Sequence, residues 1–552
     1  MSQTLTTRFA ALPSRDRTLL LAVAAVALAA LTLGILGGLL TAFARAGFIE
    51  VAPDSGYRFL TLHGVSVFFY WLYLAQAALL LGFAAIEDTG GLGWRGAALA
   101  GGLLMLLGFG FSLTGAYMGT PPLYDGAPAL LEEEPRTLLV FNLGYVLLGL
   151  GLMLTPAAAI ATLLRSLGRG GRDRLSAVGF ALLAWAGFLI VTGFAALHAF
   201  LPGALWALGI GAFPVAQTTN WHILFHNLHY LPLMATVLMW YVLMQALTGV
   251  QSVFGARFSK IVFAMYLVFV PPTSLYHMFL EPSLPEAVKV TGSLLSLFVS
   301  VPTLTAFLII VASLEVHARS RGARGLFGWI RMLPWQQPAM AAAGVAVISM
   351  GFGIVLAFVL IQEKLAPLLS DTFFVPGYFH FFTVGTVSMT LLAAFSVMLP
   401  GLSGRALAWP GLMRLMPWLA MAGLLLFGGA GVAAGYLGVP RRVIEVSYGG
   451  EAPVLWQTLM AIMGVGGSLM ALALLVFTMG VAVAIVPGRS AAAPRPAVPL
   501  AELGTVPLRP GVAAWTGPVA MLVIVLAMYG FTTLGFELMQ NLPVTAVGGT
   551  GH

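Results

Sequence analysis

Residues 18–44 read TLLLAVAAVALAALTLGILGGLLTAFA, a run of 27 residues without a charged side chain. At a rise of about 1.5 Å per residue, a helix of this length exceeds the hydrocarbon core of a bilayer, which is about 30 Å thick. The rest of the chain has the same character, because 60% of its 552 residues are hydrophobic and only 8% are charged. Soluble proteins contain about 25% charged residues. The sequence therefore predicts an all-α integral membrane protein.

Apolar segments long enough to cross a membrane recur along the whole chain, and we expect about thirteen of them. Backbone polar groups find no water inside lipid, so each segment is expected to be a helix. Short connections predict a single helical bundle over residues 1–552, with a flexible Pro/Ala-rich linker at 487–513 before the last helix. The expected spans cover residues 18–44, 60–86, 93–118, 138–165, 176–202, 219–247, 259–280, 286–314, 338–362, 379–400, 412–437, 455–486 and 514–538.

Basic residues are distributed unequally between the two sides of these spans. With the N-terminus inside, 19 of the 26 Lys and Arg residues fall in inner loops, as the positive-inside rule requires. The net charge of +7 is thus a topology signal and does not indicate nucleic-acid binding. We expect a protein of a prokaryotic plasma membrane, in contact with lipid, with a cytoplasmic N-terminus.

Four of the nine histidines, His63, His226, His277 and His380, fall near the same predicted depth in four different spans. The topology above places all four in the outer third of the membrane. Ionisable residues within spans are costly and indicate function. A lone histidine is most simply a hydrogen-bonded core residue, but four at one depth indicate haem or metal. The chain contains no cysteine, which excludes disulfides, thiolate ligands and iron–sulfur clusters.

Two further features are compatible with haem. Gly64 directly follows His63 and leaves room for a flat ring, although close helix packing explains such a glycine equally simply. Arg441 and Arg442 lie in an outer loop, where they offer bidentate contacts to haem propionates. A pair of solvated arginines is the alternative explanation for this dipeptide.

The span over 219–247 carries three histidines on one face. His222, His226 and His229 are spaced i, i+4 and i+7, which aligns them along a helix. Neutral imidazole suits copper, zinc or iron. His277, on the next span, offers a further ligand. The alternative is a polar stripe that faces water or another helix.

At these residues the sequence resembles subunit I of the haem–copper oxidase superfamily, specifically the B class of terminal cytochrome c oxidases. The resemblance extends over nearly the whole chain and includes the expected thirteen helices. The motifs that carry it are Thr61-Leu62-His63-Gly64, Val375-Pro376-Gly377-Tyr378-Phe379-His380, Gly325-Leu326-Phe327-Gly328-Trp329-Ile330-Arg331 with Leu333-Pro334-Trp335, and Val439-Pro440-Arg441-Arg442.

The resemblance implies a role for each of these residues. His63 and His380 correspond to the two axial ligands of a low-spin haem, whose propionates the Arg441–Arg442 pair binds. A second haem and copper are implied at a binuclear centre. There, the corresponding residues are His226 and His277 as copper ligands and Tyr230 as the tyrosine linked covalently to His226.

Two positions depart from the family pattern, and both belong to the binuclear centre. Tyr378 stands where the family has the proximal histidine of the high-spin haem, and Tyr276 stands where it has a copper ligand. A tyrosine can bind ferric haem, but phenolate would lower the iron potential and disfavour oxygen binding. His229 or His222 are the candidates to replace the lost copper ligand.

The resemblance implies an oxidoreductase that passes electrons through the low-spin haem to the binuclear centre, where oxygen is reduced with proton uptake. Tyr230 would donate a proton and an electron. Cytochrome c is the expected donor. A second subunit is expected to carry the copper-A-like or cytochrome c site that receives the electrons, because this chain lacks the cysteines for copper-A.

Three other functions stay open at this point. A nitric oxide reductase would have a modified non-haem site, and Glu281, one turn beyond His277, offers a carboxylate for it. A non-catalytic electron-transfer subunit would keep only the bis-histidine haem. A transporter fits the number of spans but does not explain the common depth of the histidines.

Overall fold

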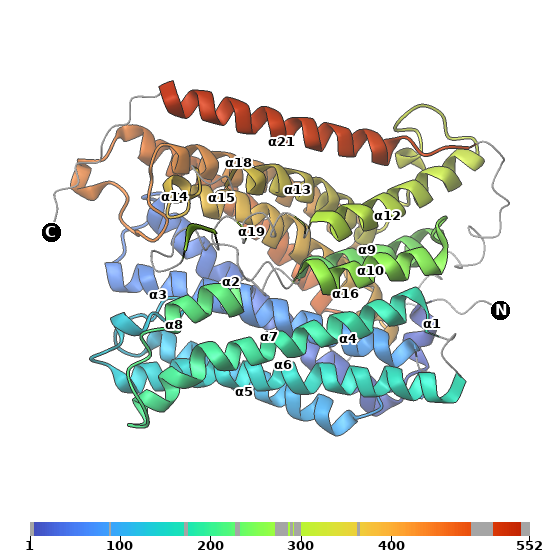
Figure 1. Cartoon of the computed structure of the whole chain (residues 1–552), viewed down its shortest axis with the longest axis horizontal. Helices are drawn as coiled ribbons and strands as arrows, with labels where there is room; N and C mark the ends of the chain where they lie inside the picture. The colour runs from blue at the N-terminus through green and yellow to red at the C-terminus, as the bar shows by residue number, and fades with distance from the viewer. Residues whose placement is uncertain are drawn as a thin grey trace.

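The protein is described by a computed structural model, in which nearly all of the described chain is helical. The described residues are 5–87, 90–170, 175–226, 232–270, 285–287, 291, 298, 300–360, 365–486 and 512–541. Figure 1 shows the helices running side by side along one axis of the molecule. Within the described residues, ten helices are long and apolar enough to cross a membrane. The all-helical membrane fold expected from the sequence is therefore confirmed.

Each expected span overlaps a helix of the structure. The ten long ones are α2 (Ser14–Arg45), α3–η1–α4 (Pro53–Glu87), α5 (Arg95–Tyr117), α6 (Pro135–Gly170), α7 (Ala177–Ala207), α12 (Ser300–Ser320), α13 (Pro338–Leu360), α15–η9–α16 (Phe374–Ser403), α17–α18 (Pro410–Tyr436) and α19 (Val454–Ala482). Three further expected spans overlap α9 (Pro232–Thr248), α10 (Gly255–Phe269) and α21 (Thr516–Asn541), and parts of the expected spans 219–247, 259–280 and 286–314 lie outside the described residues. The predicted linker at 487–513 lies almost wholly outside the described residues.

Among the described residues, three segments are wound as π-helix, in which backbone hydrogen bonds join residues i and i+5. They are η1 (Gly64–Trp71), η4 (Trp221–His226) and η9 (Phe381–Ser388). Such segments are rare and occur frequently at functional sites. Here η1 begins directly after His63, η9 begins directly after His380, and η4 ends at His226. Local widening of the helix thus accompanies three of the histidines singled out in the sequence.

Small residues allow α5 and α6 to pack closely. A Cβ on Gly108 would lie 2.6 Å from the carbonyl oxygen of Gly144, and a Cβ on Gly151 would lie 2.8 Å from that of Gly101. Larger side chains are therefore excluded at these crossings. Close approach of this kind is the main source of helix association where lipid removes the hydrophobic driving force.

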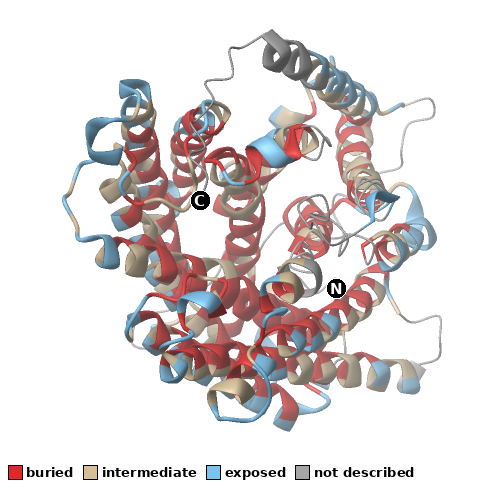
Figure 2. Ribbon diagram, turned by 60° about the vertical axis from the view of Figure 1, so that its left-hand side comes forward, coloured by how far each residue is buried: buried red, intermediate tan, exposed pale blue. Residues whose placement is uncertain are grey.

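Buried polar pairs connect neighbouring helices of the bundle. Trp71 Nε1 donates a hydrogen bond of 3.0 Å to Ser388 Oγ, and Trp240 Nε1 donates one of 2.8 Å to Thr390 Oγ1. The first joins η1 to η9, and the second joins α9 to α16. Figure 2 shows that the helix faces turned toward one another are mostly buried.

The last helix, α21, is held by a buried carboxylate at its first turn. Glu315 of α12 is fully buried and accepts hydrogen bonds from the backbone N–H groups of Trp515 (2.9 Å) and Thr516 (2.8 Å). Arg319 neutralises the same carboxylate at 2.7 Å. The first N–H groups of a helix lack partners within the helix and favour negative charge. Glu315 therefore caps α21 from a neighbouring helix.

Replacing Glu315 by glutamine tests this cap. Glutamine keeps the shape but loses the charge and one acceptor oxygen, so we expect the free energy of unfolding to fall by about 1–3 kcal/mol. The measurement is thermal unfolding in detergent, followed by tryptophan fluorescence. Glu132→Gln, at an exposed loop position, is the control. Equal melting temperatures for the two variants would contradict the cap.

Candidate haem site

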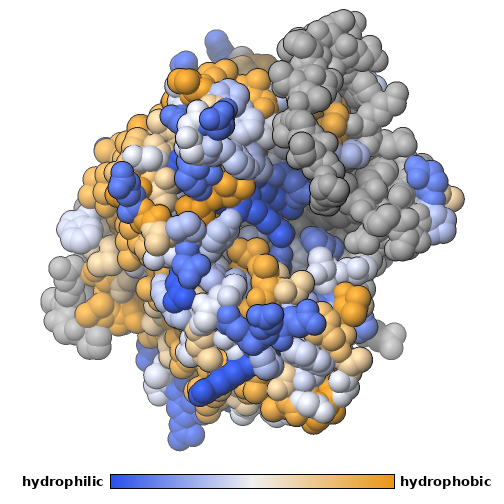
Figure 3. Space-filling model, turned by 90° about the vertical axis from the view of Figure 1, so that its left-hand side faces the viewer, coloured by the Kyte–Doolittle hydropathy of each residue, from blue (hydrophilic) through white to orange (hydrophobic). Residues whose placement is uncertain are grey.

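A cavity of about 330 Å³ lies between α2, α3–η1, α15–η9 and α19. Its wall is mostly apolar, with Leu31, Phe68, Met463 and Leu474 among the lining side chains. Figure 3 looks onto the end of the bundle at which α3 and α15 begin, where hydrophilic residues gather near the middle of the face. A largely apolar cavity with few polar groups is the usual form of a cofactor site.

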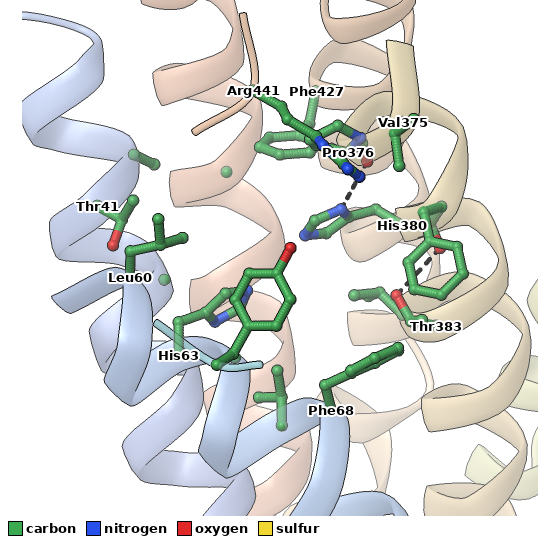
Figure 4. Close-up of a pocket in the computed structure, with 18 of the residues that line it drawn as sticks. Thr41, Leu60, His63, Phe68, Val375, Pro376, His380, Thr383, Phe427 and Arg441 are labelled. Carbon is green, nitrogen blue, oxygen red and sulfur yellow. Dashed lines mark hydrogen bonds between the residues drawn. The ribbon is translucent and has the colours of Figure 1, made fainter. Parts of the chain in front are cut away.

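His63 and His380 point into this cavity from opposite sides (Figure 4). Their ring centroids are 6.2 Å apart, and the ring planes are inclined by only 8°. Two imidazoles that bind one metal ion from opposite sides, each through a bond of about 2.0 Å, place their centroids about 6.3 Å apart. The pair therefore has the separation that axial coordination of one iron requires.

Hydrogen bonds fix the protonation of both rings. Nδ1 of His63 lies 2.7 Å from the carbonyl oxygen of Gly34, and Nδ1 of His380 lies 2.7 Å from that of Pro376. A carbonyl only accepts, so each Nδ1 carries the hydrogen and donates it. Each Nε2 then keeps its lone pair for a metal, which is the arrangement found in most metal-binding histidines.

Gly64 lines the cavity, but close packing against a neighbouring side chain is what excludes a larger residue at this position. A Cβ on Gly64 would lie 2.5 Å from Cβ of Tyr124. The alternative of close packing therefore accounts for this residue directly. The sequence did not indicate Tyr124, which lines the cavity from the loop before α6.

Arg441 and Arg442 lie at the mouth of the cavity, and both side chains are partly buried and paired with carboxylates. Arg441 Nη2 lies 2.9 Å from Asp371 Oδ1, and Arg442 Nη2 lies 3.1 Å from Asp125 Oδ2. Nε of both guanidinium groups is buried and has no hydrogen-bond partner among the described residues. Figure 4 shows Arg441 above His380. Buried donors without a partner indicate an acceptor in the cavity, and haem propionates fit them.

The charge of Arg442 is maintained in this setting. Burial alone would lower the pKa of its guanidinium, but the neighbouring Tyr124 and Asp125 outweigh that effect, and the pKa lies above its usual value. A permanent positive charge therefore faces the cavity mouth.

Of the three histidines in the predicted stripe, His222 is the one whose side chain the structure describes. The ring of His222 lines the same cavity as His63 and His380, beside the ring of Trp221 at 5.1 Å. For His226, the backbone of η4 is described but the side chain is not. His229, Tyr230, Tyr276, His277 and Glu281 lie outside the described residues. Among the side chains that are described, no three His, Asp or Glu residues form a metal-binding group.

Tyr378 is buried among aromatic side chains. Its ring lies 6.0 Å from that of Phe374, 5.9 Å from that of Phe379 and 6.3 Å from that of Phe382. It also contributes to the wall of the cavity. The phenol therefore occupies a densely packed position next to the bis-histidine pair.

Phe427 and Asp125 complete the site, and sequence reasoning did not identify either. Phe427 of α18 lies 4.5 Å from the ring of His380, and Asp125 lies in the loop between α5 and α6. Both belong to segments distant in sequence from the residues they contact. No local pattern marks such pairs, because they meet only in the folded bundle.

A family model described as "Cytochrome C and Quinol oxidase polypeptide I" matches residues 18–469, which is most of the chain. The chain belongs to this family. Members of the oxidase polypeptide I family typically bind haems and copper, and the bis-histidine cavity is consistent with that property.

Two known proteins illustrate the relationship. Cytochrome c oxidase subunit 1 of Thermus thermophilus is 31% identical to this oxidase polypeptide I chain over 241 residues, which is 43% of each protein. The match thus spans less than half of either chain. A cryo-EM structure of a heme-copper terminal oxidase dimer superposes with a TM-score of 0.76 at 19% identity, covering 95% of this chain and 92% of that one. This structure shares the fold.

Proposed function

We propose that the chain is the haem-bearing core subunit of a membrane oxidase complex. A partner subunit or cytochrome c supplies electrons at the outer side, and a second centre within the bundle reduces oxygen with proton uptake. The observation that carries the proposal is the pair of parallel imidazoles, 6.2 Å apart, in a cavity with two guanidinium groups at its mouth.

Two groups of cavity residues would hold a haem, one by binding the iron and the other by pairing with the propionates. His63 and His380 would bind the iron through Nε2, and Arg441 and Arg442 would pair with the propionates. When bound, the haem supplies a one-electron carrier. The apolar walls exclude water, which keeps the local dielectric constant low and so influences the reduction potential.

The second centre is proposed on the family resemblance alone. His226, His277 and Tyr230 would hold copper and supply a proton, with a second haem beside them. His222 lines the bis-histidine cavity, which makes it the less suitable replacement for the copper ligand lost at Tyr276. His229 is therefore the better candidate. The B-class assignment of the oxidase is part of this proposal.

A second candidate function is electron transfer without catalysis. The crowded aromatic surroundings of Tyr378 favour it, because this side chain has the packing of a structural residue. In this case the chain would carry electrons to another subunit and would bind one haem and no copper.

Turnover of the purified complex tests the proposed function. Reduced cytochrome c and a quinol are supplied in turn, and uptake of oxygen and of nitric oxide is recorded. Oxygen uptake that depends on cytochrome c supports the oxidase. Uptake of nitric oxide alone contradicts it in favour of a nitric oxide reductase, and absence of both favours the non-catalytic subunit.

Tyr378→His restores the ligand that the family has at this position. If a second haem is bound through Tyr378, we expect the variant to lose the charge-transfer absorption of phenolate-ligated iron and gain a histidine-ligated spectrum. The measurement is the optical spectrum of the oxidised protein. Tyr378→Phe is the control, since it removes the phenol without adding a ligand. Identical spectra for wild type and both variants would exclude Tyr378 as an iron ligand.

A further inference from the structure

We propose that Gly38 and Phe427 are positioning residues that hold the ring planes of His63 and His380 parallel. Their arrangement would thereby set the electronic state of the iron between the two rings. The inference rests on the proposed bis-histidine haem, but it concerns the orientation of the ligands and not their identity.

Gly38 of α2 forms a wall against the ring of His63. A Cβ on Gly38 would lie 2.6 Å from Nδ1 and 2.8 Å from Cε1 of this ring. No side chain fits there while the ring keeps its place. On the same helix, one turn earlier, the carbonyl of Gly34 accepts the Nδ1 hydrogen at 2.7 Å. A hydrogen bond and a flat backbone surface thus fix the rotation of His63 about its Cβ–Cγ bond.

The ring of His380 is held by a different pair of contacts. Its Nδ1 donates to the carbonyl of Pro376 at 2.7 Å. The ring of Phe427, a buried residue of α18, lies 4.5 Å away at an inclination of 48°. Phe427 is in turn packed against α19, where a Cβ on Gly467 would lie 3.6 Å from its ring. Rotation of His380 would therefore collide with a side chain that has little freedom to move.

The two sets of contacts are independent, yet they leave the imidazole planes within 8° of each other. The angle between axial ligand planes determines which iron d orbitals overlap with the imidazole π orbitals. When the planes are parallel, both imidazoles interact with the same one of two iron d orbitals. The energies of these two orbitals then differ, which gives a rhombic low-spin ferric spectrum. Perpendicular planes act on both orbitals equally and give a spectrum with one large g value. Orientation of the ligands by neighbouring groups is a recognised means of tuning a metal centre.

Electron paramagnetic resonance of the oxidised, full-length protein with its haem measures this angle. We expect a rhombic low-spin signal from the wild type. In Gly38→Ala, the new methyl group forces the ring of His63 out of its plane. The signal should shift to the large-g type, with a change of the midpoint potential, while the optical spectrum stays that of a bis-histidine haem.

Gly37→Ala is the matched control on the same helix. The three nearest atoms to a Cβ on Gly37 would be N of His63 at 3.0 Å, O of Phe59 at 3.1 Å and Cγ of Leu62 at 3.2 Å, so none of them belongs to the imidazole ring. The control therefore disturbs helix packing but not ring rotation, and its signal should remain rhombic. Equal signals from Gly37→Ala and Gly38→Ala would overturn the role of Gly38.

Phe427→Leu provides a second test that does not depend on the folding of the glycine variants. Leucine retains an apolar side chain but removes the flat surface, so the rhombic signal should broaden as His380 gains rotational freedom. An unchanged line shape would overturn the role of Phe427. A large-g signal in the wild type, with a bis-histidine optical spectrum, would overturn the inference and leave the proposed function standing. Absence of any low-spin haem would instead contradict the proposed function.

Discussion

Replacing His380 by alanine is expected to abolish the low-spin haem of the purified protein. The iron would lose one of its two axial ligands, and the remaining ring of His63 cannot hold a six-coordinate low-spin state alone. The reduced-minus-oxidised optical spectrum should therefore lose its sharp low-spin band completely. The same loss is expected for His63→Ala, because the two rings occupy equivalent positions 6.2 Å apart.

His198→Ala is the matched control for these variants. His198 is exposed on α7 and does not line the bis-histidine cavity, so its removal should leave the spectrum unchanged. Retention of the low-spin band in His380→Ala would refute the assignment of this ligand. A band that disappears in His198→Ala as well would point to general loss of folding.

Replacing Arg442 by alanine is expected to lower both haem retention and stability. The side chain of Asp125 is only 9% exposed, and Arg442 at 3.1 Å is its ion-pair partner. Breaking a fully buried pair costs about 3–5 kcal/mol, but Arg442 is itself 37% exposed, so we expect a decrease of about 1–3 kcal/mol. The measurements are thermal unfolding and the haem content after gel filtration.

The double variant Arg442→Ala with Asp125→Asn separates the two effects. Neutralising Asp125 removes the unpaired carboxylate, so the melting temperature should recover toward that of the wild type. Haem retention should stay low, because the donor to the propionate is still missing. Recovery of both properties in the double variant would show that Arg442 acts only through Asp125.

The sequence predicted the architecture well because membrane spans are encoded locally. A run such as 18–44 has few alternatives to a membrane-spanning helix, and α2 occupies this position. The ends of the helices were less accurate, since α2 extends outward from the apolar run to include Ser14 and Arg45. Polar residues at the end of a helix continue its backbone hydrogen bonding, but they do not add to the hydropathy from which a span is predicted.

The candidate site was predictable only in part. Depth along a span can be predicted from sequence, and it singles out His63 and His380, whose rings face each other in the structure. The angle between those rings, the Asp125–Arg442 pair and the contact of Phe427 depend on how distant helices meet. The π-helical segments η1, η4 and η9 were also not anticipated, because the composition of Gly64–Trp71 or Phe381–Ser388 does not distinguish them from α-helix.

Haem and copper content per purified chain, combined with the optical spectrum, tests the central claim most directly. The account predicts at least one haem per chain with the spectrum of bis-histidine, low-spin iron. If the chain is an oxidase subunit, a second haem and one copper are also expected. A haem-free protein, or one whose haem survives unchanged in the double variant His63→Ala with His380→Ala, would contradict the account.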